Sequence, residues 1–134
     1  MLISCGRDSD PAMMPFLQSL ASMNSPHHGI RIQVKLYIVP VGNQTDIPYS
    51  RVNHNKYMVT DKVAYIGTSN WSGDYFMTTA GVGLVVSQHA PDPAGETQAL
   101  QTQLRAIFDR DWNSEFAVHL GDLGNHRDCA LLST

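Results

Sequence analysis

Two strand-like runs joined by only two residues constrain the fold of this chain more than any other feature. Residues 54–60 and 63–69 are rich in β-branched and aromatic side chains, and only Asp61 and Lys62 separate them. Runs of this kind with a two-residue connection are typical of a tight β-hairpin. Asp-Lys is a less usual turn pair than Asp-Gly, but the pattern still predicts two antiparallel strands.

The rest of the chain alternates between further strands and two helices. Asp10 before Pro11 is a helix-start signature, and the apolar residues that follow at helical spacing predict a helix over residues 11–23. A second amphipathic pattern predicts a helix over residues 96–112. Strands are expected at 2–5, 30–39 and 82–87, and irregular segments at 41–53, 70–79, 91–95 and from 121 onward. We therefore expect one α/β domain over residues 1–134, with a mixed central β-sheet flanked by helices.

Composition and charge narrow the class of protein. Apolar residues make up 43 % and charged residues 16 %, as in globular chains. The formal net charge of −3 argues against a broad basic surface for nucleic acid or an anionic membrane, although it permits a small cationic pocket. The sequence shows neither a membrane-spanning apolar run nor a signal peptide. Because a core strand opens the chain, we expect a fragment or an alternative start.

The first strand of the hairpin carries an imidazole and an ammonium two residues apart. Strand side chains alternate between faces, so His54 and Lys56 are expected on one face and Asp61 on the other. A histidine can transfer protons near neutral pH, and a lysine can hold the non-bridging oxygens of a phosphodiester. Thr68 and Asn70 close the far end of the hairpin and could donate hydrogen bonds to the same oxygens. The pattern predicts phosphodiester cleavage without a metal or other cofactor, with Asp61 in an orienting or structural role.

These residues belong to a longer pattern that resembles the phospholipase D superfamily. Its His-Lys-Asp signature is matched by His54-x-Lys56-x4-Asp61 followed by Gly67-Thr68-Ser69-Asn70. Two longer segments are similar to the endolysosomal branch of the superfamily, phospholipase D three and four. They are Arg-Val-Asn-His-Asn-Lys-Tyr-Met-Val-Thr and Tyr-Ile-Gly-Thr-Ser-Asn-Trp-Ser-Gly. The resemblance runs from Leu2 to about Phe116. Five residues separate Asp61 from Gly67 instead of the usual six, and the endolysosomal branch shares this shorter hairpin.

The resemblance implies that the chain is the C-terminal half of a two-motif enzyme. In that superfamily two halves pack about a pseudo-twofold axis, and one histidine attacks phosphorus while the other protonates the leaving oxygen. By carry-over His54 would be the acid/base, Lys56 and Asn70 would hold phosphate, and Thr68 would assist. The implied activity is a 5′-exonuclease on single-stranded DNA or RNA. The alternatives are a phospholipid phosphodiesterase or transphosphatidylase, and an inactive half-domain with a structural or regulatory role.

The resemblance also implies partners and a compartment. A missing N-terminal half or a second copy of the chain would complete the site, and the workplace would be the endolysosomal and ER–Golgi lumen, with a membrane anchor that this chain lacks. In such an oxidising compartment Cys5 and Cys129 could form a disulfide, whereas composition alone favours two unpaired thiols. Asn43 begins an Asn-Gln-Thr glycosylation sequon in a polar loop.

Other aromatic and histidine residues leave alternatives open. Trp71, Tyr75 and Phe76 could stack on a nucleobase, or they could be packing residues beside a core strand. His27 and His28 resemble a metal-binding pair, but no third ligand lies at a suitable spacing, so we expect solvated loop histidines.

Overall fold

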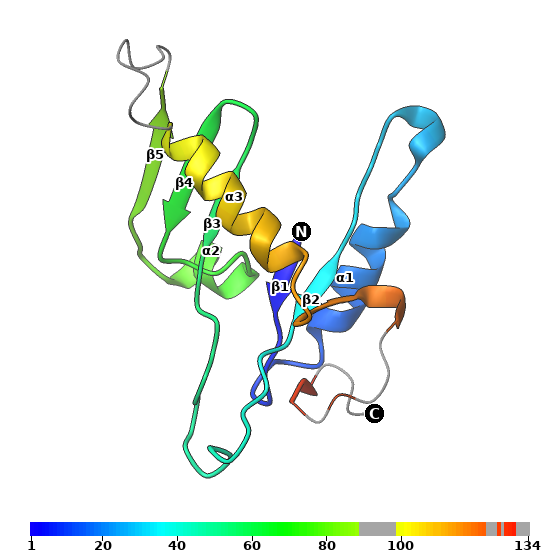
Figure 1. Cartoon of the computed structure of the whole chain (residues 1–134), viewed down its shortest axis with the longest axis vertical. Coiled ribbons are helices and arrows are strands. Elements are labelled where there is room, and N and C mark those ends of the chain that lie inside the picture. Colours follow the sequence, from blue (N-terminus) through cyan, green and yellow to red (C-terminus); the bar gives the residue numbers. More distant parts are fainter. Residues whose placement is uncertain (89–98, 123–125, 127, 131–134) are drawn as a thin grey trace. The chain divides into compact units, whose positions relative to one another are not determined.

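The protein has a mixed α/β fold, which confirms the expected class (Figure 1). The structure is a computed structural model that describes residues 1–88, 99–122, 126 and 128–130. Within these residues the strands form two three-stranded sheets, whereas the sequence predicted one central sheet. The chain divides into two compact units. One comprises Met1–Asn53 and the described residues from Asp111 onward, and the other comprises the described residues of His54–Arg110.

The first unit is built on a β-α-β arrangement. Strand β1 (Leu2–Ser4) pairs in parallel with β2 (Lys35–Tyr37), and helix α1 (Met13–Ser22) lies between them in the chain. Parallel neighbours need a crossover connection of this kind. Strand β6 (Ala117–His119) pairs antiparallel with β2, so β2 is the central strand.

The core of this unit lies between the sheet and α1. Leu36, in the middle of the central strand, is completely buried, and Leu17 is the buried residue of α1. The same cluster contains Val34, Ile38 and both cysteines. Apolar burial of this kind supplies most of the stabilisation of a small unit.

Two details of this unit differ from the sequence prediction. The strand expected over 30–39 is limited to Lys35–Tyr37, because Ile30 instead forms an isolated bridge with Ser25 around a short 3-10 helix, η1 (Pro26–His28). The sequence did not predict strand β6. A second 3-10 helix, η2 (Leu120–Asp122), follows it.

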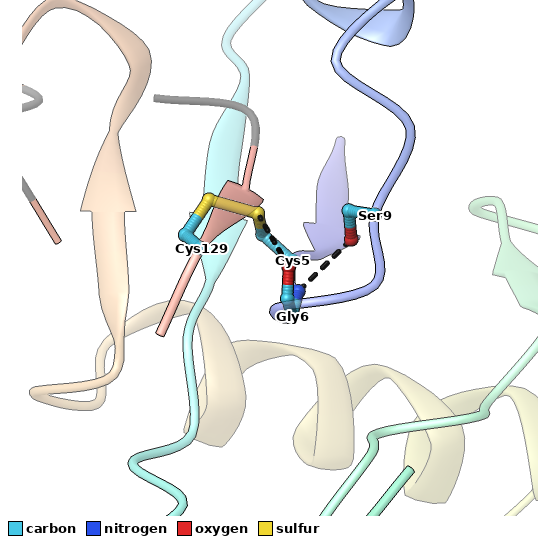
Figure 2. The surroundings of a disulfide bond; sticks show 4 residues. All are labelled: Cys5, Gly6, Ser9 and Cys129. Atoms are coloured by element: carbon cyan, nitrogen blue, oxygen red, sulfur yellow. Dashed lines mark hydrogen bonds between the residues drawn. A yellow bond between two sulfur atoms is a disulfide. The ribbon is translucent and has the colours of Figure 1, made fainter. Parts of the chain in front are cut away.

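A disulfide between Cys5 and Cys129 joins the end of β1 to the C-terminal part of the first unit (Figure 2). The two cysteines are separated by 124 positions and are 3 % and 1 % exposed. Nearby, the Gly6 amide donates to Ser9 Oγ at 2.9 Å, and the Ala130 amide donates to the Gly6 carbonyl at 2.9 Å. The pairing that the family resemblance implied is confirmed.

The second unit contains the predicted hairpin and one more strand. Strands β3 (Tyr57–Val59), β4 (Val63–Gly67) and β5 (Gly83–Ser87) form an antiparallel sheet in that order. Helix α3 (Leu100–Trp112) belongs to this unit up to Arg110. The start predicted for this helix, residues 96–98, and the linker predicted at 91–95 lie outside the described residues.

Helix α2 (Gly73–Thr78) corrects the prediction of a loop over residues 70–79. Ser72 precedes it in an extended conformation, and its hydroxyl donates to Asp74 at 2.5 Å. This hydrogen bond lowers the pKa of the Asp74 carboxyl, which lies in the first turn, where a negative charge favours a helix.

The hairpin turn is closed by a side chain, which explains how it forms without glycine. Thr60 Oγ1 accepts hydrogen bonds from the amides of Lys62 (3.2 Å) and Val63 (2.9 Å). Neither Asp61 nor Lys62 adopts a positive φ, unlike the central residues of the common Asn-Gly turn. Gln101 of α3 donates to the Thr60 carbonyl and so joins the helix to this turn.

No helix in the described part of the chain combines the length and the apolar character needed to cross a bilayer.

Candidate active site

Lys56 is held at the start of β3 by the ladder between β3 and β4. The Gly67 amide donates to the Lys56 carbonyl at 2.8 Å, which continues the register in which Met58 faces Tyr65. Lys56, Met58 and Tyr65 therefore share one face of the sheet. Lys56 is partly buried, and this burial lowers the pKa of its ammonium. The backbone of Lys56 is therefore fixed to β4, and its side chain lies on the same face of the sheet as Met58.

His54 lies just outside the ladder and is exposed to solvent. Strand β3 begins at Tyr57, so alternation along a strand does not fix the direction of the His54 imidazole. The expectation that His54 and Lys56 share a face therefore stays a prediction. A direct contact does join the two residues, because Lys56 Nζ donates to the His54 carbonyl at 3.0 Å.

Asp61 lies in the hairpin turn and is exposed. It follows Lys56 by five positions, with all of β3 (Tyr57–Val59) between them, so their Cα atoms are at most about 16–18 Å apart. The orienting or structural role expected for Asp61 stays a prediction.

Thr68 and Asn70 follow strand β4, which ends at Gly67, two residues before the end that the sequence predicted. Thr68 Oγ1 donates to the Val82 carbonyl at 3.2 Å and accepts from the Val82 amide at 3.2 Å. Thr68 thereby joins the ends of β4 and β5, and its hydroxyl hydrogen is donated to the backbone although the residue is exposed. Asn70 is exposed. The arrangement leaves Asn70 as the accessible donor and gives Thr68 the task of fixing the segment that carries it.

Three aromatic rings follow one another from this sheet to α2. Tyr65 and Trp71 meet edge to face with ring centroids 6.1 Å apart, and Trp71 and Phe76 do so at 6.5 Å. Trp71 is nevertheless 54 % exposed and Phe76 72 % exposed. These two rings are both packing residues and open surfaces, whereas Tyr75 is half-buried.

Tyr65 was not among the residues that the sequence singled out. Its ring lies over two glycines: a Cβ added at Gly67 would come within 2.8 Å of Tyr65 Cζ, and one at Gly83 within 2.7 Å of Cε2. The signal that points to this arrangement is the pair of glycines in positions that face each other on β4 and β5. Glycine in a strand commonly marks such a close approach, and here the two glycines are the last residue of β4 and the first of β5.

The remaining candidates lie in the first unit. Asn43 is exposed in a turn next to Gly42, which has a φ of 61°. His27 and His28 are exposed in η1, and His28 Nδ1 lies 2.7 Å from Ser25 Oγ. The described residues contain no group of three or more His, Cys, Asp or Glu side chains arranged to hold a metal ion.

Curated relatives match nearly the whole chain. The chain is 54 % identical over 130 residues to 5′-3′ exonuclease PLD4 of Homo sapiens, and this match covers 96 % of the chain. It is 51 % identical over 129 residues to 5′-3′ exonuclease PLD3 of Xenopus laevis, again 96 % of this chain. The chain belongs to the phospholipase D family. The resemblance carried by the His-Lys-Asp signature is thus confirmed at the level of the family.

The match covers only part of each relative. The chain spans about a quarter of the length of the curated relatives, 25 % of human PLD4 and 26 % of Xenopus laevis PLD3. Human PLD3 is similar in this respect, at 52 % identity over 121 residues and 24 % of its length. No protein-family model matches the chain.

Proposed function

We propose that the protein carrying this chain is a 5′-exonuclease that hydrolyses single-stranded DNA or RNA. The observation that carries the proposal is the 54 % identity, over 96 % of the chain, to a relative named 5′-3′ exonuclease PLD4. The geometry of the hairpin supports it, because Lys56 is a cation held on one sheet face and Asn70 is an accessible amide beyond the neighbouring strand.

In this proposal the reaction has two steps and needs a second histidine from the completing half or from a second copy of the chain. That histidine attacks phosphorus, so a P–N bond forms as the P–O bond to the leaving group breaks, and His54 donates a proton to the leaving oxygen. His54 then takes a proton from water as the water oxygen attacks phosphorus and releases the first histidine. Lys56 and Asn70 hold the non-bridging oxygens throughout.

The open aromatic rings suit a strand of nucleotides. Trp71 and Phe76 present exposed faces beside the sheet that carries Lys56, and stacking of bases on aromatic rings tolerates any sequence. Tyr75, which is half-buried, contributes less surface. A phospholipid head group has no base to place on such rings, so the nucleic-acid substrate is favoured.

An oxidising lumen is the proposed workplace. Cys5 and Cys129 form a buried disulfide, and such bonds persist mainly in secretory compartments. Asn43, the first residue of the sequon, is exposed and therefore accessible to glycosylation. Treatment of the secretory-pathway protein with an endoglycosidase should increase its gel mobility, and the Asn43→Gln variant should lose the part of that shift due to this site.

The activity test uses the full-length protein and a single-stranded oligonucleotide with a 5′-hydroxyl. Loss of an acid/base residue typically costs about 10²–10⁴-fold in rate, so His54→Gln should reduce turnover by at least about 10²-fold. His27→Gln, which changes another exposed histidine, should leave turnover unchanged. Full turnover by His54→Gln would remove His54 from the mechanism. Complete loss of wild-type activity on adding a chelator would contradict the metal-free scheme.

A further inference from the structure

A cavity lies in the first unit at the carboxyl ends of its two parallel strands. It has a volume of about 310 Å³ and is lined by residues that follow β1 and β2, among them Gly6 and Val39, and by the loop that ends at Asn53. In open α/β sheets, ligands bind outside the carboxyl ends of parallel strands. The volume is at the lower end of the range found for small-molecule sites.

The charged side chains of this cavity favour an anion. Arg7 and Arg51 contribute two positive charges and Asp8 one negative charge, which leaves the wall at +1 in a chain whose net charge is −3. Among the described residues neither guanidinium forms an ion pair. Arg7 Nη1 has only a long hydrogen bond, 3.4 Å, to the Thr45 carbonyl. Guanidinium groups in this state suit bidentate binding of a phosphate.

The loop that supplies Arg51 holds an unusual backbone. Tyr49 and Arg51 both have a φ of 56°, a backbone conformation that residues other than glycine and asparagine rarely adopt. Ser50 between them is fixed, because its hydroxyl donates to the Gln44 carbonyl at 2.9 Å and its amide to the Ile47 carbonyl at 3.3 Å. Backbone strain of this kind is concentrated at functional sites.

Tyr49 supplies an aromatic surface at the same cavity. It lines the cavity and is 74 % exposed. A phenol ring on the wall that also carries two guanidiniums provides the two parts that recognise a nucleotide: a stacking surface for the base and cations for the phosphate.

We propose that this cavity binds one nucleotide of the single-stranded substrate, with Arg7 and Arg51 on its phosphate and Tyr49 stacked on its base. The inference rests on the proposed function. Arg51 precedes His54 by three residues, so their Cα atoms are at most about 11 Å apart. In this proposal the nucleotide in the cavity is a neighbour, along the strand, of the nucleotide that reacts.

The binding test uses the full-length protein with His54→Gln, so that the probe is not consumed. The probe is a 3′-fluorescein-labelled hexathymidylate, followed by fluorescence anisotropy over a range of salt concentrations. Arg7→Ala and Arg51→Ala should each weaken binding by about tenfold, since a charge-assisted hydrogen bond contributes on this scale. Each should also reduce the slope of log K against log salt by about 0.7, the value for one phosphate contact of a single strand. Tyr49→Leu should weaken binding without changing this slope. Tyr49→Phe, which keeps the ring, should bind with the affinity of the parent protein.

The matched control is Arg31→Ala, which removes an exposed arginine that does not line the cavity. It should leave both affinity and slope unchanged. Unchanged affinity and slope in Arg7→Ala and Arg51→Ala would overturn the inference, as would an equal effect of Arg31→Ala. Should Arg51→Ala fail to fold because of its backbone, Arg7→Ala decides the matter, since Arg7 has no positive φ.

A second measurement separates this inference from the proposed function. With otherwise wild-type protein, the cavity variants should keep their kcat/KM for bis(p-nitrophenyl) phosphate, which has no neighbouring nucleotide, and raise KM for the oligonucleotide. An equal loss on both substrates would refute a nucleotide subsite. Full turnover by the His54→Gln variant would refute the proposed function instead, whatever the cavity variants do.

Discussion

Breaking the Cys5–Cys129 disulfide should destabilise the protein by an amount that its loop length sets. The bond closes a loop with a sequence separation of 124. In the chain-entropy description a loop of this length loses about 16 cal/mol/K in the unfolded state, or about 5 kcal/mol at 25 °C. Native domains are stable by about 5–15 kcal/mol, so this is a large share of the total.

The assay compares urea-induced unfolding of Cys5→Ala, Cys129→Ala and the double variant in the full-length protein. Either single substitution removes the whole cross-link, so each should cost about 5 kcal/mol plus about 1 kcal/mol for the lost sulfur in a buried site. The double variant should be only slightly less stable than either single variant. The two substitutions are therefore expected to be strongly non-additive.

Reduction of the wild-type protein provides the control for packing. Reduced wild type keeps both sulfur atoms, so its difference from oxidised wild type isolates the cross-link, and its difference from the double variant isolates the lost atoms. A difference below about 1 kcal/mol between oxidised and reduced wild type would refute the entropic reasoning. Because Cys5 also lines the cavity, the reduced protein should bind the hexathymidylate probe more weakly.

Three further outcomes test the hairpin. Gly67→Ala should destabilise the protein by about 1–3 kcal/mol in urea unfolding, because its Cβ would press on the Tyr65 ring; Gly73→Ala, which meets nothing within 4 Å, should not show this loss. Burial lowers the pKa of Lys56, so the unfolded state binds that proton more tightly, and the free energy of unfolding should rise as pH increases toward the ordinary value of 10.5. Lys56→Met should remove this rise, and an unchanged pH profile would contradict it. Insertion of one glycine after Asp61 should leave exonuclease turnover within about threefold of wild type, because the turn takes up the extra residue and the register of the strands is unchanged. Loss of turnover would contradict this reasoning.

The sequence predicted those helices and strands that a short stretch of residues is enough to define. The hairpin, β5 and α1 were predicted to within one to three residues at most ends, because alternation and helical spacing are properties of short windows. Strand β6 was missed because its three residues carry no alternation of their own. It exists through pairing with β2, about 80 positions earlier, and such long-range pairing leaves no trace in a window.

Predictions about the site divide in the same way. The ladder extends to the Lys56 carbonyl and so places this residue on the face of Met58, whereas the face of His54, which lies before the ladder, stays a prediction. The hydroxyl of Thr68 was expected to face a substrate, and its hydrogen bonds to Val82 join it to a residue fourteen positions away, just before β5. The disulfide came from the family resemblance, because two cysteines 124 positions apart carry no geometric information in the sequence. The cavity is lined by the loop in which Tyr49 and Arg51 have a positive φ, and their residue types do not predict this backbone conformation.

The spacing of the family signature follows from the register of this hairpin. Lys56 and Gly67 are bonded across the ladder, so the number of residues between them is set by two strand lengths and one turn. An extra residue inside either strand would move every later side chain to the opposite face, and would turn Asn70 away from the phosphate that Lys56 is proposed to hold. An extra residue in the turn changes only the connection, because Thr60 and Val63 still face each other. The five-residue spacing between Asp61 and Gly67 is therefore compatible with the face that Lys56 occupies, because a change in the turn alone leaves the register of the two strands intact.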